Sequence, residues 1–174
     1  MLLNNLEIGD IKTGIINAII EIPKGSHNKY EYDSTTNSMR LDRVLPTFWA
    51  YPTDYGFIPE TLSEDGDHLD ILIIQELPSK TGNIIKIRVI GVLEMVDEKG
   101  RDYKIIGVME RDEKMKNISE VTDLNPLLLQ KISHFFEDYK KLENNKFSNV
   151  GHFKNRDFAL KEILKSREAY LKNH

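Results

Sequence analysis

The segment 84-IIKIRVIGVLEMVDEKGRDYKIIGVM-109 contains two apolar runs separated by a short charged turn. Residues 84–96 are rich in β-branched side chains, which favour a strand, and Gly91 predicts a bend or bulge within it. Gly100 predicts a tight turn, after which residues 103–109 return as the antiparallel partner. The segment therefore predicts a long β-hairpin, which commits this part of the chain to a sheet.

More strands are expected on the N-terminal side of this hairpin. Branched apolar residues, or alternation of apolar and polar residues, mark each of them, and Gly25 and Pro23 mark a break between the first two. The run that begins at Leu69 is apolar throughout and predicts a buried strand. The expected strands span residues 14–23, 29–33, 39–45 and 69–74.

The C-terminal third changes to helical periodicity. In residues 125–143 the apolar side chains recur at helical spacing, with Asn125 as the expected N-cap and Pro126 at the first helical position. A second helix is expected over residues 156–172, with Ala159, Ile163 and Tyr170 on one face. Strands followed by helices predict an α+β protein that is mainly β.

Residues 1–174 are expected to form a single domain, because no internal repeat, linker or low-complexity tract interrupts them. A small closed barrel with the two helices packed outside it would leave few strand edges exposed. The N-terminus lacks a basic region followed by an apolar run, so no signal peptide is expected. The apolar runs are too short to cross a membrane, so no membrane partner is expected.

The composition excludes several classes of site. The chain has no cysteine, which excludes disulfides, thiolate metal sites and cysteine nucleophiles. Its formal net charge is −4, which argues against nucleic acid as the main partner, because duplex binding needs a clustered cationic surface.

Two acidic turns are the strongest candidates for a functional site. If the turns faced water, their carboxylates would be ordinary turn residues, and spacing alone leaves that open. If the turns converge, a cation must hold them together, and oxygen ligands favour Mg²⁺, Mn²⁺ or Ca²⁺ over Zn²⁺. An EF-hand is excluded because Asp70 stands where that loop requires glycine. The acidic residues are Asp65, Asp67 and Asp70 in one turn and Asp97, Glu98 and Asp102 in the other.

Cationic and tyrosyl side chains accompany these acids along the chain. Lysine supplies a point charge for a phosphate group, arginine a bidentate fork, and tyrosine a hydroxyl donor. Each one alone would be an ordinary surface or core-edge residue. Together with the acidic turns they fit a polyanion bound through divalent cations. They are Lys29, Arg43, Tyr51, Tyr55, Tyr139 and Lys140.

Six motifs, in order and spacing, resemble those of the soluble family I inorganic pyrophosphatases, from about residue 18 to residue 145. The resemblance implies a five-stranded OB-like closed barrel with helices packed on it. It also implies Mg²⁺-dependent hydrolysis of pyrophosphate to two phosphates in the cytoplasm. The motifs are 21-EIPKGSHNKYEYD-33, 42-DR-43, 51-YPTDYGFIPETL-62, 65-DGDHLD-70, 91-GVLEMVDEKGRDYK-104 and 134-HFFEDYKKLE-143.

The resemblance also implies a role for each matched residue. Asp67 is the expected general base, which accepts the proton of the attacking water. Several Mg²⁺ ions are expected at each site, with Mn²⁺ or Zn²⁺ as possible substitutes. The expected metal ligands are Asp65, Asp70, Asp97 and Asp102. The expected substrate-binding residues are Lys29, Arg43, Tyr55, Lys104, Tyr139 and Lys140, and the supporting residues are Glu21, Glu31, Tyr51 and Glu98.

One position departs from the family pattern: His68 stands where these enzymes usually have proline. As the ordinary interpretation, His68 is a solvent-exposed turn residue. The alternative makes it an extra ligand that favours Mn²⁺ or Zn²⁺. The resemblance further implies a homo-oligomer, expected to be a hexamer. The alternative function for the whole chain is a non-catalytic OB-type barrel that binds oligonucleotides.

Overall fold

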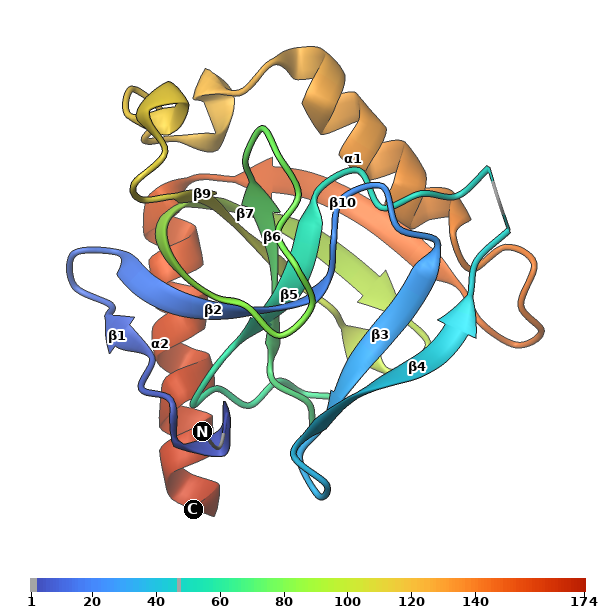
Figure 1. Cartoon of the computed structure of the whole chain (residues 1–174), viewed down its shortest axis with the longest axis horizontal. Coiled ribbons are helices and arrows are strands. Elements are labelled where there is room, and N and C mark those ends of the chain that lie inside the picture. Colours follow the sequence, from blue (N-terminus) through green and yellow to red (C-terminus); the bar gives the residue numbers. More distant parts are fainter. Residues whose placement is uncertain (1–2, 47) are drawn as a thin grey trace.

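The computed structural model describes residues 3–46 and 48–174. The fold is mainly β with two α-helices, as predicted (Figure 1). Five strands pair in a ring, in which each strand pairs with the next and β7 pairs back to β2. In ring order they are β2 (Ile15–Ile22), β5 (Asp54–Ile58), β6 (Leu69–Ile74), β9 (Lys104–Met109) and β7 (Ile84–Asp97).

The predicted hairpin forms the β7–β9 side of this ring. The antiparallel register of β7 and β9 shifts between Val89 and Gly91, so the predicted bulge at Gly91 is confirmed. The short strand β8 (Gly100–Arg101) pairs with the end of β7 in the connecting turn. A Cβ at Gly91 would lie 2.6 Å from the carbonyl oxygen of Lys154, so a side chain there would force the next strand away.

Besides the two-residue β8, three strands escape the sequence prediction: β5, β1 (Gly9–Asp10) and β10 (Ser148–Lys154). Residues 54–58 are entirely buried, but Pro52, Gly56 and Pro59 are residue types that predict a loop. A Cβ at Gly56 would lie 1.9 Å from the carbonyl oxygen of Ile19, so glycine is required where β2 and β5 cross closely.

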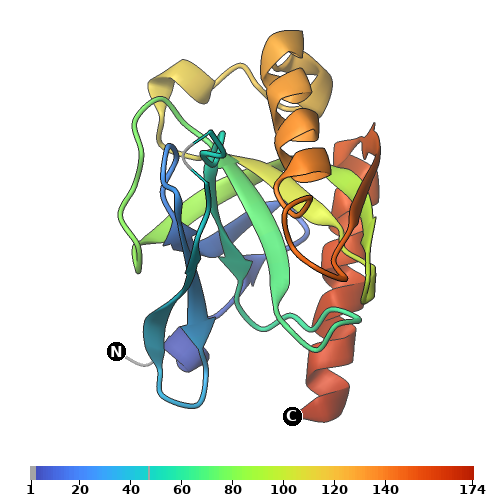
Figure 2. The same ribbon diagram turned by 90° about the vertical axis from the view of Figure 1, so that its right-hand side faces the viewer.

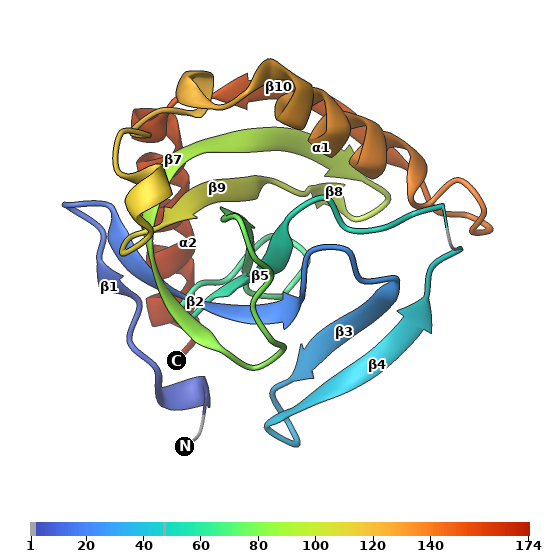
Figure 3. The same ribbon diagram turned by 45° about the horizontal axis from the view of Figure 1, so that its top comes forward.

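The predicted strands at residues 29–33 and 39–45 form a separate hairpin of β3 (Asn28–Asp33) and β4 (Ser38–Val44). This hairpin stands beside the ring rather than in it (Figure 3). Its side chains are half-buried or exposed, and it extends the wall of the ring on the side of β2. It thereby provides a second surface that faces the acidic turns.

The two helices lie outside the ring, α1 (Pro126–Asp138) above it and α2 (Arg156–Asn173) alongside it (Figure 2). The predicted N-cap is confirmed, since the side chain of Asn125 accepts a hydrogen bond from the backbone N–H of Leu127. However, α1 ends at Asp138 and does not continue to residue 143. The backbone continues in tighter turns, in which the N–H of Lys141 donates to Asp138 and the N–H of Glu143 donates to Lys140, while the Lys140 side chain bonds to Asp97 and Glu98.

The apolar core has two parts, one under each helix. Phe135 and Phe136 of α1 pack with Tyr55 and other ring residues in the first part. Ala159 and Ile163 of α2 pack on the ring in the second. Burying a side chain as large as Phe136 contributes about 1.5–3 kcal/mol. Three 3₁₀ helices, η1 (Leu3–Asn5), η2 (Glu113–Met115) and η3 (Val121–Asp123), complete the structure. Within the described residues, no helix has the length and apolarity needed to cross a membrane.

Candidate active site

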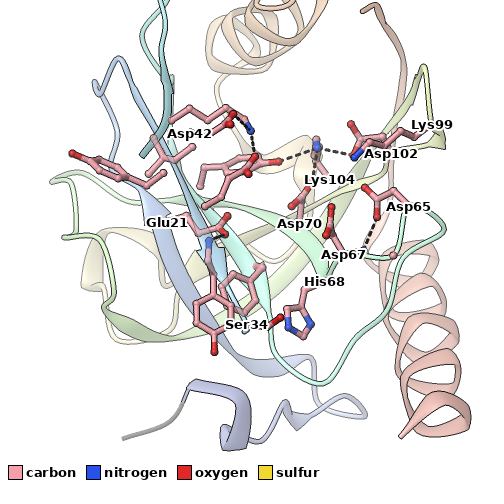
Figure 4. A pocket seen from close by; sticks show the side chains of 18 of the residues that line it. Glu21, Ser34, Asp42, Asp65, Asp67, His68, Asp70, Lys99, Asp102 and Lys104 are labelled. Carbon is pink, nitrogen blue, oxygen red and sulfur yellow. Dashed lines mark hydrogen bonds and ion pairs between the residues drawn. The ribbon is translucent and has the colours of Figure 1, made fainter. Parts of the chain in front are cut away.

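A cavity of about 850 Å³ opens between the β3–β4 hairpin, the two acidic turns and the end of α1 (Figure 4). Nine carboxylate side chains and six lysine or arginine side chains line it. Carboxylates in this excess repel one another unless a cation lies among them. Of the fifteen predicted site residues, only Tyr51 does not line this cavity.

The first acidic turn leads directly into β6. The backbone N–H of Asp67 donates a hydrogen bond of 3.0 Å to the side chain of Asp65, which is an Asx-turn. Gly66 supplies the positive φ, 89°, that this turn requires. Partial burial and then the neighbouring charge of Asp65 raise the pKa of Asp67, which favours proton acceptance by this carboxylate.

Lys104 connects the first acidic turn to the second. β6 and β9 are parallel with Asp70 opposite Lys104, so the two side chains lie on the same face of the ring. The Lys104 ammonium lies 2.6 Å from Asp70 Oδ2 and 2.6 Å from Asp102 Oδ1, and it donates to the Tyr55 hydroxyl at 2.9 Å (Figure 4). Burial opposes the charge of Lys104, but Asp102 and Asp70 outweigh burial and raise its pKa well above the usual range.

The second acidic turn is held by the residues that follow α1. Lys140 donates to Asp97 Oδ2 at 2.9 Å, and its Nζ lies 3.4 Å from Glu98 Oε1. Partial burial opposes ionisation of Asp97, but the bond from Lys140 and that from the N–H of Lys99 lower its pKa. Asp97 therefore stays ionised near neutral pH, as a cation ligand requires.

The β3–β4 hairpin provides the cations on the opposite wall. Lys29 and Arg43 are direct cross-strand partners, so they present their charges together. Lys29 pairs with Glu31 and lies 3.3 Å from Asp42, while Arg43 Nε lies 2.7 Å from Glu143. These pairs leave both cations at the cavity wall, where a phosphate group can meet them.

Glu21 is a buried acid at the cavity wall. Its carboxylate accepts a hydrogen bond of 2.8 Å from the backbone N–H of Tyr32. Burial is the largest cause that raises its pKa to about 8 from 4.5, and the charge of Asp70 adds to it. Folded protein near pH 7 therefore holds Glu21 largely protonated in the absence of metal.

We expect Glu21→Gln to flatten the pH dependence of stability in metal-free buffer. Between about pH 4.5 and pH 8 the unfolded chain releases the Glu21 proton while the folded chain keeps it. The free energy of unfolding of the wild type should therefore fall, relative to the variant, as pH rises across this range. Urea unfolding in EDTA at pH 5, 6, 7 and 8 measures this difference.

Glu137→Gln, at an exposed acid of α1, is the matched control. Its free energy of unfolding should change with pH as that of the wild type does. Parallel curves for the wild type and Glu21→Gln would contradict the shifted pKa.

Two predicted residues lie differently from expectation. Tyr51 is buried behind the cavity, where its ring packs 4.7 Å from that of Phe135. The interpretation of His68 as a solvent-exposed residue is wrong: it is half-buried, and its ring stacks on Phe57 at 4.9 Å. Its Nδ1 carries a proton, because it lies 2.8 Å from the carbonyl of Thr61, which can only accept.

The cavity also has residues that sequence reasoning did not select. Asp42 is next to Arg43 in sequence and so could have been found from the motif that contains both. Tyr32 and Phe57 also lie within quoted motifs, but no local pattern predicts that their rings stack, because they come from different strands. The unselected residues include Asp42, Lys99, Lys146, Tyr32, Phe57, Tyr170 and His174.

The donor set suits a hard divalent cation, because it consists of carboxylate oxygens without sulfur. Among the described residues, no three acidic or histidine side chains converge on one point. The lysine ammonium groups lie between the carboxylates instead, Lys104 between Asp70 and Asp102, and Lys140 against Asp97. The two lysine side chains thus already place positive charge beside these carboxylates.

Comparisons with known proteins give a consistent result. The sequence model of one family, described as inorganic pyrophosphatase, matches residues 18–171. An inorganic pyrophosphatase of Thermus thermophilus is 45% identical over 163 residues, 92% of this chain and 93% of that protein. One of Campylobacter jejuni is 44% identical over 172 residues, 98% of this chain and 99% of that protein.

The structural comparison agrees over nearly the whole chain. The crystal structure of the inorganic pyrophosphatase from Thermus thermophilus superposes with a TM-score of 0.94 at 43% identity. It covers 98% of this chain and 99% of its own. With a family model that matches most of the residues and relatives of this identity and coverage, the chain belongs to the inorganic pyrophosphatase family.

Proposed function

We propose that this protein hydrolyses inorganic pyrophosphate to two orthophosphates. The observation that carries the proposal is that one cavity is lined by both acidic turns and by Lys29 and Arg43. A cavity that holds both a carboxylate set for cations and cations for phosphate suits a metal complex of a small polyanion. The oligonucleotide-binding alternative is disfavoured by the nine carboxylates, which would repel a nucleic-acid backbone.

Mg²⁺ is the proposed cofactor, several ions for each site, with Mn²⁺ or Zn²⁺ as substitutes. Asp65, Asp70, Asp97 and Asp102 would hold the ions, and Glu21, Glu31 and Glu98 would support them. When bound, Mg²⁺ supplies Lewis-acid chemistry, which lowers the pKa of water and neutralises charge on the phosphate oxygens.

The chain's own residues do the rest of the chemistry. Asp67 accepts the proton of the attacking water at its carboxylate, and it works best with a pKa close to the operating pH. The raised pKa of Asp67 moves it in that direction. The substrate-binding side chains hold phosphate oxygens and stabilise the leaving phosphate by charge and hydrogen bonds. They are Lys29, Arg43, Tyr55, Lys104, Tyr139 and Lys140.

Phosphate release from pyrophosphate, measured with and without Mg²⁺, tests the proposal. We expect release with Mg²⁺ and none in excess EDTA. Mg²⁺ without substrate should also raise Tm, because it binds the folded state. At a hundredfold excess over Kd, it should add about 2.7 kcal/mol to the free energy of unfolding. A protein that releases no phosphate but shifts an oligonucleotide in a gel would support the alternative function.

Several broader features are also part of this proposal. Residues 1–174 form one domain, and the five-strand ring is an OB-like closed barrel, in keeping with the pairing of β7 with β2. The protein acts in the cytoplasm as a homo-oligomer, a hexamer by its family resemblance. Sedimentation velocity would distinguish a hexamer from a monomer of 20.2 kDa.

A further inference from the structure

A stack of aromatic rings lies beside the catalytic turn. The ring of His68 lies nearly parallel to that of Phe57 on β5, with centroids 4.9 Å apart and an interplanar angle of 11°. Phe57 also stacks on Tyr32 of β3, with centroids 5.2 Å apart. His68 also contacts Tyr170 of α2 at 6.5 Å. The stack therefore links two strands and the last turns of the C-terminal helix to the residue next to Asp67.

Hydrogen bonds also hold His68 in place. Nδ1 of His68 donates to the carbonyl of Thr61 at 2.8 Å. The hydroxyl of Thr61 donates to the carbonyl of Ile58 at 2.6 Å and accepts from the N–H of Leu69 at 2.9 Å. Thr61 is fully buried. The end of the turn, at His68 and Leu69, is thus bonded to one buried threonine that lies before the turn.

The C-terminal helix holds the start of the loop by a second contact. The hydroxyl of Ser166 donates to the carbonyl of Leu62 at 2.8 Å, and the N–H of Leu62 donates to the carbonyl of Ser166 at 3.0 Å. α2 therefore contacts this loop at two places, Leu62 before Asp65 and His68 directly after Asp67.

Asp67 itself is held through its backbone. Its N–H donates to Asp65, and its carbonyl accepts from the N–H of Ser63 at 2.8 Å. Within residues 3–46 and 48–174, no hydrogen bond or ion pair is made by the Asp67 carboxylate. The direction of this carboxylate consequently depends on how firmly the turn is held, and His68 is its immediate neighbour (Figure 4).

We propose that His68 is a positioning residue for Asp67: the His68 ring stacks on Phe57, makes a tilted contact with Tyr170 and bonds to Thr61, and so holds the catalytic turn. A proline fixes its own φ and so stiffens such a turn covalently. In this protein the turn is stiffened by ring packing and by one hydrogen bond of the His68 side chain. The contact with Tyr170 means that the C-terminal helix also supports the turn. The inference rests on the proposed function, because it assigns Asp67 the role of base.

Three variants test it with saturating Mg²⁺. His68→Ala removes the stack and the hydrogen bond, and we expect kcat to fall about tenfold, since a misplaced base loses rate steeply. KM for pyrophosphate should stay within about twofold, because the cations that bind phosphate lie on other elements. His68→Phe keeps the ring and should recover most of the lost kcat. His134→Ala, at an exposed histidine of α1, is the matched control and should match the wild type.

Tyr170→Ala tests the helix contact by a double-mutant cycle. Alone it should lower kcat about threefold to tenfold, but added to His68→Ala it should lower kcat no further, because both act on one support. Tm and the folded fraction are measured for every variant. A kcat that falls only in proportion to the folded fraction, or a His68→Phe variant as slow as His68→Ala, would overturn the inference.

The inference can fail separately from the proposed function. If the wild type releases no phosphate from pyrophosphate, the function fails, and hydrogen exchange of residues 61–69 then tests the support alone. Faster exchange in His68→Ala and Tyr170→Ala than in His68→Phe would uphold the support of the turn, and equal exchange would refute it. If the wild type is active and His68→Ala keeps its kcat, only the inference fails.

Discussion

Asp67→Asn should bind divalent cations and pyrophosphate as the wild type does, yet turn over about 10²–10⁴ times more slowly. The amide has the size of the carboxylate but cannot accept the proton of the attacking water. The backbone bonds that shape the turn, from Asp67 N–H to Asp65 and from Ser63 N–H to Asp67, do not involve the replaced atoms. The fold of the turn should therefore survive the change.

The measurement is kcat for phosphate release, with metal affinity from calorimetry. Asp157→Asn, at an exposed acid of α2 outside the cavity, serves as the control and should keep wild-type turnover. Unchanged turnover in Asp67→Asn would remove Asp67 as the base. A loss of turnover together with lost metal binding would make it a ligand instead.

Lys104→Met should destabilise the metal-free protein by about 3–5 kcal/mol. Lys104 is 2% exposed, and its ammonium lies 2.6 Å from each of two carboxylates. Removing it leaves Asp70 and Asp102 close together without the charge that compensates them. The thioether chain keeps the volume of the lysine stem, so the loss reports charge more than packing.

Urea unfolding in EDTA measures this effect. Adding Asp102→Asn to Lys104→Met should recover part of the lost stability, because one of the two unpaired charges is removed. Lys161→Met, at an exposed lysine of α2, should change stability by no more than about 0.5 kcal/mol. A loss this small for Lys104→Met would show that solvent already screens the two carboxylates.

Local sequence patterns predicted most of the elements. The β7–β9 hairpin, the bulge at Gly91 and the N-cap at Asn125 all follow from short-range rules about branching, turns and caps. β5 escaped prediction because its glycine and flanking prolines are typical of loops. The close approach of β2 that makes Gly56 necessary is a long-range contact, which no window of sequence contains.

The structure places the predicted site residues, Tyr51 excepted, around one cavity, while their roles stay predictions. Motifs identified which acids and cations belong together, because their residue types suit metal-bound phosphate. Their partners were not predictable: Lys104 faces Asp70 only because β6 and β9 pair in parallel in one particular register. Lys140 likewise meets Asp97 only because the chain leaves α1 at Asp138 and passes the end of β7.

The sequence by itself determined the family, the chemical types at the site and the departure at His68, because these are properties of residue identity and spacing. Tertiary structure alone decided what His68 contacts. Its ring meets Phe57 and Tyr170 from elements far apart in the chain, and its Nδ1 meets a carbonyl seven residues earlier. Burial and stacking depend on neighbours in space, so the histidine that looked exposed in sequence lies half-buried between elements that are distant in the chain.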